Sequence, residues 1–170
     1  MVDCHYVIPL KMLPLYGYLC IREYTRVNLD WYLGIEHPPW DVTNTIFYVP
    51  AFSAAILASG CACFTVWTAL EGSEERRFLM IPYVVQMVCL WADYPMLMGG
   101  QSLVGGLVNI CVTTLLASVT GFTFWMVKPR AGHMMLPYLG FLLYEMCRDA
   151  WMYRKWWENY DAWHEAEENP

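Results

Sequence analysis

The sequence has 170 residues, of which 58% are apolar and only 15% are charged, with nine tryptophans and a mean hydropathy of +0.30. A soluble domain of this length cannot bury so much apolar surface, so the composition predicts an integral, multi-pass membrane protein whose first partner is the lipid bilayer. Much of the net charge of -6 comes from the acidic stretch 158–168. We interpret that stretch as a solvated tail, and no nucleic-acid-binding surface is predicted from it.

Five apolar segments predict an all-α membrane protein, built as a five-transmembrane-helix bundle. No charged residue lies between Asp41 and Glu71, or between Asp93 and Lys128. Both gaps exceed the roughly 20 residues that a helix needs to cross hydrocarbon, whereas barrel strands would be about ten residues long with turns between them. The predicted helices cover about residues 5–21, 45–70, 78–98, 103–127 and 134–153. The predicted organisation is one five-helix domain, 1–157, followed by a polar C-terminal tail, 158–170.

The segments differ in character along the chain. The first contains Pro9 and Pro14, which are expected to kink it. A polar loop, residues 22–44, follows and is called loop one below. The second and fourth segments carry no charge and are rich in small residues, which let helix backbones approach closely in lipid. Gly105 and Gly106 in the fourth segment are of this kind and permit the close contact of a homodimer.

The third and fifth segments carry ionisable groups at similar depth. Asp93 and Arg148 lie about equally far along two helices that run in the same direction. A charge at the bilayer centre costs about 2.5 to 3.5 kcal/mol, so we predict that these two side chains pair or face a wet pocket near loop one. Alternatively, both reach the membrane surface. Glu145 shares a helix face with Arg148 (i+3) and Asp149 (i+4), so a local Glu145–Arg148 pair is the competing interpretation.

Aromatic residues recur at positions that could surround a flat ligand. The set consists of Trp31, Trp40, Phe52, Trp91, Phe141 and Trp151. Their rings would stack on the face of a planar molecule or, in the alternative interpretation, form bundle core and an interfacial aromatic belt. Cys61 and Cys63 lack further ligands at metal-binding spacing, so no metal site is predicted.

The order of four short motifs resembles the translocator protein family, also known as the peripheral-type benzodiazepine receptor or tryptophan-rich sensory protein family. The motifs are Trp31-Tyr32 with Pro38-Pro39-Trp40, Val66-Trp67, Gln86 with Trp91, and Pro137-Tyr138-Leu139. The resemblance covers nearly the whole chain. It implies a compact, often dimeric five-helix bundle that binds tetrapyrroles, cholesterol or drug-like molecules. For eukaryotic members it also implies the outer mitochondrial membrane.

The sequence departs from the family pattern where its charges lie. Asp93 aligns with a position that is usually tryptophan, and Arg148 and Asp149 align with a usual Leu-Asn pair. Phe52 stands at a position where many members have tryptophan. These departures concern the lining of the site more than the fold.

We therefore interpret the chain as a membrane receptor for planar hydrophobic ligands, such as a porphyrin, haem or a sterol, held between the helices beneath loop one. The predicted ligand-binding residues are Trp31, Trp40, Phe52, Trp91, Asp93, Phe141, Glu145, Arg148 and Asp149. No catalytic residue and no required cofactor are predicted, and a bound tetrapyrrole would be a ligand. The first alternative is a porphyrin-oxidising enzyme of the same fold that uses Trp91 and Trp151. The second is a small transporter whose polar path contains Asp93, Glu145 and Arg148.

Overall fold

The structure is a computed structural model that describes residues 14–17, 28–42 and 46–168, apart from the side chains of Arg76 and of 161–168. Every regular element in these residues is helical, and they contain no strand. The elements are α2 (Leu29–Leu33), α3 (Tyr48–Ala69), α4 (Glu75–Tyr94), the π-helical turn η2 (Pro95–Gly99), α5 (Leu103–Val127) and α6 (Pro129–Glu168). The prediction of an all-helical chain is confirmed for the described residues.

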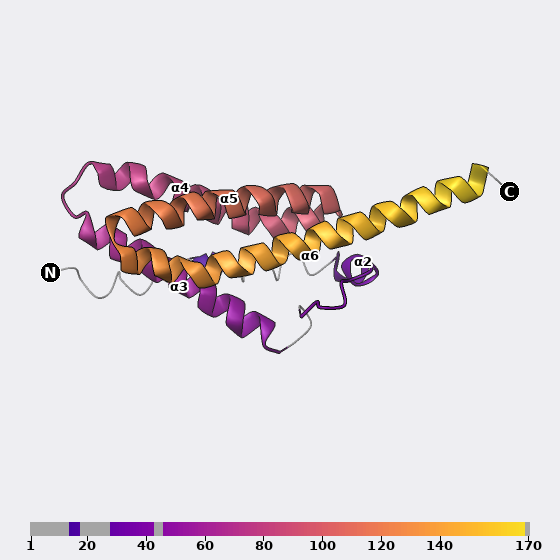
Figure 1. Cartoon of the computed structure of the whole chain (residues 1–170), viewed down its shortest axis with the longest axis horizontal. Coiled ribbons are helices and arrows are strands. Elements are labelled where there is room, and N and C mark those ends of the chain that lie inside the picture. Colours follow the sequence, from indigo (N-terminus) through magenta and orange to yellow (C-terminus); the bar gives the residue numbers. More distant parts are fainter. Residues whose placement is uncertain (1–13, 18–27, 43–45, 169–170) are drawn as a thin grey trace.

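Helix α5 lies against two neighbours, with α4 on one side and α6 on the other, while α3 packs mainly on α6 (Figure 1). A side-chain cap begins α5, because the Ser102 hydroxyl oxygen accepts a hydrogen bond of 3.0 Å from the Gly105 backbone N–H. The helix ends where Lys128 adopts an extended backbone. Its bounds coincide with the expected range 103–127.

Proline explains the change of helix type after α4. Pro95 has no backbone N–H, so the α-helical hydrogen bond to the carbonyl four residues back cannot form. The next turn is wider, with the Gly100 N–H donating to the Pro95 carbonyl at 2.9 Å and the Ser102 N–H donating to the Leu97 carbonyl at 3.1 Å. The chain thereby turns into α5 at the same end of the bundle as α2 (Figure 1).

Helix α6 is much longer than expected. It begins at Pro129 and continues to Glu168, whereas the sequence predicted a helix over 134–153 and a polar tail from 158. Glu158 receives hydrogen bonds of 2.8 Å from both Arg154 and Lys155, at i+4 and i+3 spacing. Such pairs support a solvated helix, so the polar sequence continues the helix beyond the bundle (Figure 1).

Three helices in the described part of the chain are long and apolar enough to cross a membrane: Tyr48–Ala69, Arg77–Gly99 and Leu103–Val127. This count differs from the predicted five for two reasons. The first predicted segment, 5–21, lies outside the described residues except for 14–17, which are helical. The fifth falls within α6, where charged side chains interrupt the apolar run.

The outer faces of α4 and α5 carry many large apolar side chains. Large hydrophobic side chains exposed on α4 and α5 include Phe78, Ile81, Val84, Val88, Val108, Leu115 and Phe122. A soluble protein rarely exposes contiguous apolar faces of this kind, and lipid is the solvent that suits them. The integral membrane character predicted from composition is thus also visible on the surface.

Candidate ligand-binding site

Arg148 lies at the centre of a buried polar cluster on α6. Its Nη2 atom is 2.6 Å from Glu145 Oε2 and 2.8 Å from Asp149 Oδ1, and its Nε donates to the same Asp149 oxygen at 3.1 Å. All three side chains are at most 7% exposed. The structure therefore favours the local Glu145–Arg148 pair over the predicted pair of Arg148 with Asp93.

Two of the buried acids accept hydrogen bonds from other helices. The Tyr48 hydroxyl of α3 donates to Glu145 Oε1. The Asn109 amide of α5 donates to Asp93 Oδ1 at 3.1 Å and to the Cys89 carbonyl at 2.9 Å. Asp149 Oδ2 is buried and has no hydrogen-bond partner among the described residues. Asp93, Glu145 and Asp149 thus place three carboxyl groups near one guanidinium, which predicts a poor environment for a further negative charge.

The described part of loop one, residues 28–42, covers this cluster. Tyr32 of α2 is 4% exposed and packs with Leu97, Leu103 and Met152, and this burial raises the pKa of its hydroxyl, which stays protonated. His37 Nδ1 lies 2.8 Å from Asp41 Oδ2, and its Nε2 lies 3.2 Å from the Tyr32 carbonyl oxygen.

Helix α6 holds the other end of the loop through one tyrosine. The Tyr144 hydroxyl accepts from the Val42 N–H and donates to Asp41, both at 2.9 Å. These hydrogen bonds connect residues 41–42 of loop one to α6.

The predicted aromatic residues do not form a single box. Phe52 and Phe141 lie with Tyr48 beside the cluster, with ring centroids 5.4 to 6.2 Å apart. Trp40 meets Trp151 edge to face at 6.1 Å, with Trp40 half exposed. Trp31 packs against the separate group around Tyr32. Five of the six predicted aromatic residues, all except Trp91, thus lie near loop one.

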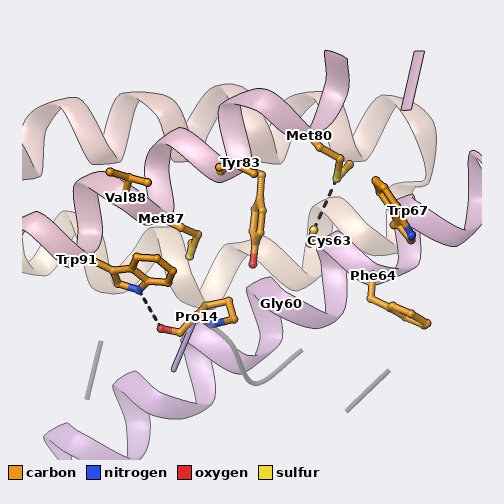
Figure 2. Close-up of a pocket in the computed structure, with 11 residues that line it drawn as sticks. Pro14, Gly60, Cys63, Phe64, Trp67, Met80, Tyr83, Met87, Val88 and Trp91 are labelled. Atoms are coloured by element: carbon orange, nitrogen blue, oxygen red, sulfur yellow. Dashed lines mark hydrogen bonds between the residues drawn. The ribbon is translucent and has the colours of Figure 1, made fainter. Parts of the chain in front are cut away.

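Trp91 lies apart from them, at an apolar cavity between α3 and α4 (Figure 2). Its indole N–H donates to the Pro14 carbonyl at 3.2 Å. The cavity has a volume of about 250 Å³. Its lining consists of Pro14, Gly60, Cys63, Phe64, Trp67, Met80, Tyr83, Val84, Met87, Val88 and Trp91. Trp91 is the only one of the nine predicted residues among them.

In the sequence, the residues that line this cavity are visible only as a helical stripe. On α3 the lining residues from Gly60 to Trp67 follow the pattern i, i+3, i+4, i+7, and those on α4 from Met80 to Trp91 continue at steps of three and four. Such a stripe looks like ordinary helix packing. It becomes a cavity because small or flexible side chains, Gly60, Cys63 and the methionines, leave space between the rings.

These features define a class of protein: a helical, multi-pass membrane protein with an apolar cavity between two helices and a polar cluster beneath a structured loop. Residues 11–154 match the model of the TspO/MBR family, and the chain belongs to that family. It is similar to the translocator protein of Bos taurus, with 28% identity over 150 residues, covering 87% of this chain and 86% of the relative. The translocator proteins of Sus scrofa, 28% identical over 75% of this chain and 76% of theirs, and of Homo sapiens, 26% over 69% of each, are similar as well. The family resemblance drawn from the four motifs is thereby confirmed.

Proposed function

We propose that this translocator-type membrane protein binds planar hydrophobic molecules, and that the cavity between α3 and α4 receives them. The cavity is the observation that carries the proposal. Two tryptophans and a tyrosine supply flat walls, and Met80 and Met87 supply adaptable ones. Among the residues that the structure describes, no charged side chain lines the cavity. Trp91 belongs both to this lining and to the residues predicted from sequence.

The size and chemistry of the cavity favour some of the proposed ligands over others. Pockets for drug-sized molecules are typically about 300–1,000 Å³, so a volume of about 250 Å³ suits a slim fused-ring molecule better than a tetrapyrrole macrocycle. A porphyrin would also bring propionate groups to an uncharged wall. We therefore place a sterol or a drug-like ligand ahead of porphyrin or haem.

The other eight predicted residues, in loop one and beneath it, are the proposed polar and aromatic side of the binding region. They are Trp31, Trp40, Phe52, Asp93, Phe141, Glu145, Arg148 and Asp149. The proposal includes five membrane-spanning helices, with the first formed by 5–21 and the fifth by the N-terminal half of α6. By family membership it also includes a homodimer in the outer mitochondrial membrane, which fractionation and cross-linking of the tagged protein can test.

A binding experiment tests the function. Purified protein in detergent is titrated with dehydroergosterol, a fluorescent sterol, and with protoporphyrin, while tryptophan emission is followed. We expect saturable energy transfer to the sterol with a micromolar or lower dissociation constant. The Met87→Trp variant, which fills the cavity, is expected to weaken sterol binding about tenfold or more.

Val108→Trp provides the matched control, because Val108 is exposed on the outer face of α5 and outside the cavity. It is expected to leave the affinity unchanged. Sterol transfer that does not saturate, or that both variants affect equally, contradicts the proposal. Light-dependent loss of protoporphyrin with a new product supports porphyrin oxidation instead, with Trp91 in the cavity wall as its candidate redox group.

A further inference from the structure

His37 in loop one contacts two groups that can only accept hydrogen bonds. Its Nδ1 atom lies 2.8 Å from Asp41 Oδ2, and its Nε2 atom lies 3.2 Å from the Tyr32 carbonyl oxygen. A backbone carbonyl has no proton to donate, and neither has an ionised carboxylate. A neutral imidazole carries one N–H and can satisfy only one of the two acceptors. Both hydrogen bonds together therefore require a ring with two protons and a positive charge.

The charges around Asp41 favour a positive ring at His37. Asp41 interacts electrostatically with Glu145 and Asp149 of α6, and these two acids share Arg148 as their counter-ion. Three carboxylates thus lie near one guanidinium. A second positive charge, on the imidazole, brings this region closer to neutrality.

The other groups around His37 do not change this balance. The Tyr32 ring stands edge to face against the imidazole, with ring centroids 4.9 Å apart, and its hydroxyl is uncharged. Glu36 is exposed and interacts with Lys155 of α6, so their two charges offset each other. The His37 side chain is 20% exposed, and water can therefore supply or remove its proton.

The doubly protonated ring connects two elements of the fold. A chain of hydrogen bonds runs from the Tyr32 carbonyl of α2 through His37 and Asp41 to the Tyr144 hydroxyl of α6. We call these four residues the clasp. Tyr32, at one end of the clasp, covers the polar cluster, and Tyr144, at the other end, precedes Glu145 on α6. Loss of one imidazole proton breaks one link of the clasp.

We propose that His37 is a pH-sensitive positioning residue, which holds the described part of loop one on α6 while it carries two protons and releases it when it loses one. Imidazole is the side chain that ordinarily changes its charge between about pH 5 and 8. The clasp is therefore complete in mild acid and loses a link as the pH rises. Because loop one covers the polar side of the binding region, a ligand should leave faster at alkaline pH, a consequence that rests on the proposed function.

Nitrogen NMR of the intact protein, labelled with 15N-histidine and kept in detergent, tests the protonation. The chain has four histidines, and the His37 signals are those that the His37→Gln variant lacks. We expect both ring nitrogens to show the protonated signature at about pH 6, and one of them to lose it by about pH 8.5. A His37 signal that stays unchanged over this range overturns the inference.

Amide hydrogen exchange of residues 30–42, divided by the intrinsic rate at each pH, measures the opening of loop one. In the unaltered protein we expect protection to fall about tenfold between about pH 6 and 8.5, the value of one hydrogen bond to a charged group. The Gln side chain of His37→Gln can donate to only one of the two acceptors, so its loop should be equally open at both pH values. His133→Gln, exposed near the start of α6, is the matched control and should keep the pH profile of the unaltered protein.

The Asp41→Asn variant is expected to have the opposite effect. The Asn amide can donate to Nδ1 of a neutral imidazole, while Nε2–H of the same ring donates to the Tyr32 carbonyl. The clasp then needs no additional proton, and loop one should stay protected at both pH values. A merely structural role of His37 would not produce one variant that is open and another that is closed at alkaline pH.

The dissociation rate of dehydroergosterol measures the consequence for the ligand. We expect it to be about tenfold higher at about pH 8.5 than at about pH 6 in the unaltered protein, and independent of pH in both clasp variants. Parallel exchange profiles in the unaltered protein and in His37→Gln overturn the inference. Saturable binding with a pH-independent rate overturns the link to ligand release and leaves the proposed function standing. If dehydroergosterol does not bind saturably, the proposed function fails, and NMR and exchange still decide on the clasp.

Discussion

Arg148 places a charged side chain inside the bundle, which an ordinary helix in lipid does not do. It is 3% exposed and is held by Glu145 and Asp149 of its own helix, one turn apart. Removing one partner of a buried ion pair strongly destabilises a protein, because the remaining charge lies in a medium of low polarity. The positive charge of Arg148 therefore chiefly offsets the cost of burying the carboxylates of Glu145 and Asp149.

The Arg148→Met substitution tests this role. We expect it to lower the free energy of unfolding by about 3–5 kcal/mol, since Glu145 and Asp149 lose their counter-ion. Arg154→Met changes the same atoms on the same helix at a position 79% exposed, and should change stability by less than about 1 kcal/mol. Chemical unfolding of both variants in the same detergent gives the comparison. Equal effects would mean that Arg148 is as well solvated as Arg154.

Sequence reasoning could find these charges but could not choose their partners. The i+3 and i+4 spacing of Glu145, Arg148 and Asp149 is visible in the chain, whereas the distance between α4 and α6 at Asp93 depends on packing. The apolar cavity was missed for the same reason, because the space between α3 and α4 depends on how the two helices pack.

At the scale of elements, close contact between α5 and α6 depends on one glycine. Gly132 lies in the first turn of α6, where a Cβ atom would lie 2.7 Å from the Trp125 Cα of α5. Gly140 lies two turns later on the same helix, and a Cβ there would meet nothing within 4 Å. The close approach of α5 therefore requires glycine at position 132, whereas position 140 has room for a side chain.

Alanine substitution at each glycine separates the two situations. Gly132→Ala should destabilise the protein by about 1–3 kcal/mol, because backbone atoms must move apart. Gly140→Ala should stabilise it by up to about 1 kcal/mol through helix propensity alone. Thermal unfolding followed by circular dichroism checks both signs. Stabilisation by both substitutions would contradict the tight α5–α6 turn.

The middles of the helices were easier to predict than their ends. An uncharged run of more than 20 residues predicts a membrane-spanning helix, and the range of α5 was predicted from such a run. The end of α6 could not be inferred from hydropathy, because it is held by charged pairs around Glu158 and by the stacked rings of Trp156 and Tyr160, 5.5 Å apart.

At the scale of the whole molecule, the number of membrane crossings decides on which side each terminus lies. Three crossings are apparent from the described helices, and two more are proposed from 5–21 and from the first half of α6. An odd number places the two termini on opposite faces of the membrane. The four motifs were sufficient for the family, because their order and spacing cover most of the chain.

Epitope tags at the two ends test the crossing number. In sealed, uniformly oriented vesicles, we expect protease to remove one tag and leave the other until detergent is added. The protein itself should stay in the membrane pellet after carbonate extraction, as its apolar outer faces require. Simultaneous removal of both tags from sealed vesicles would require an even number of crossings.

Helix α6 runs without a break from the inside of the bundle to its projecting end. At 1.5 Å per residue its 40 residues measure about 60 Å, of which the last 15 residues project about 22 Å past the predicted end of the transmembrane segment. A rigid rod magnifies small rotations, and a tilt of about 10° at Arg148 would move the far end by several ångströms. The projecting end is therefore the part of α6 that a change in packing around Arg148 would displace furthest.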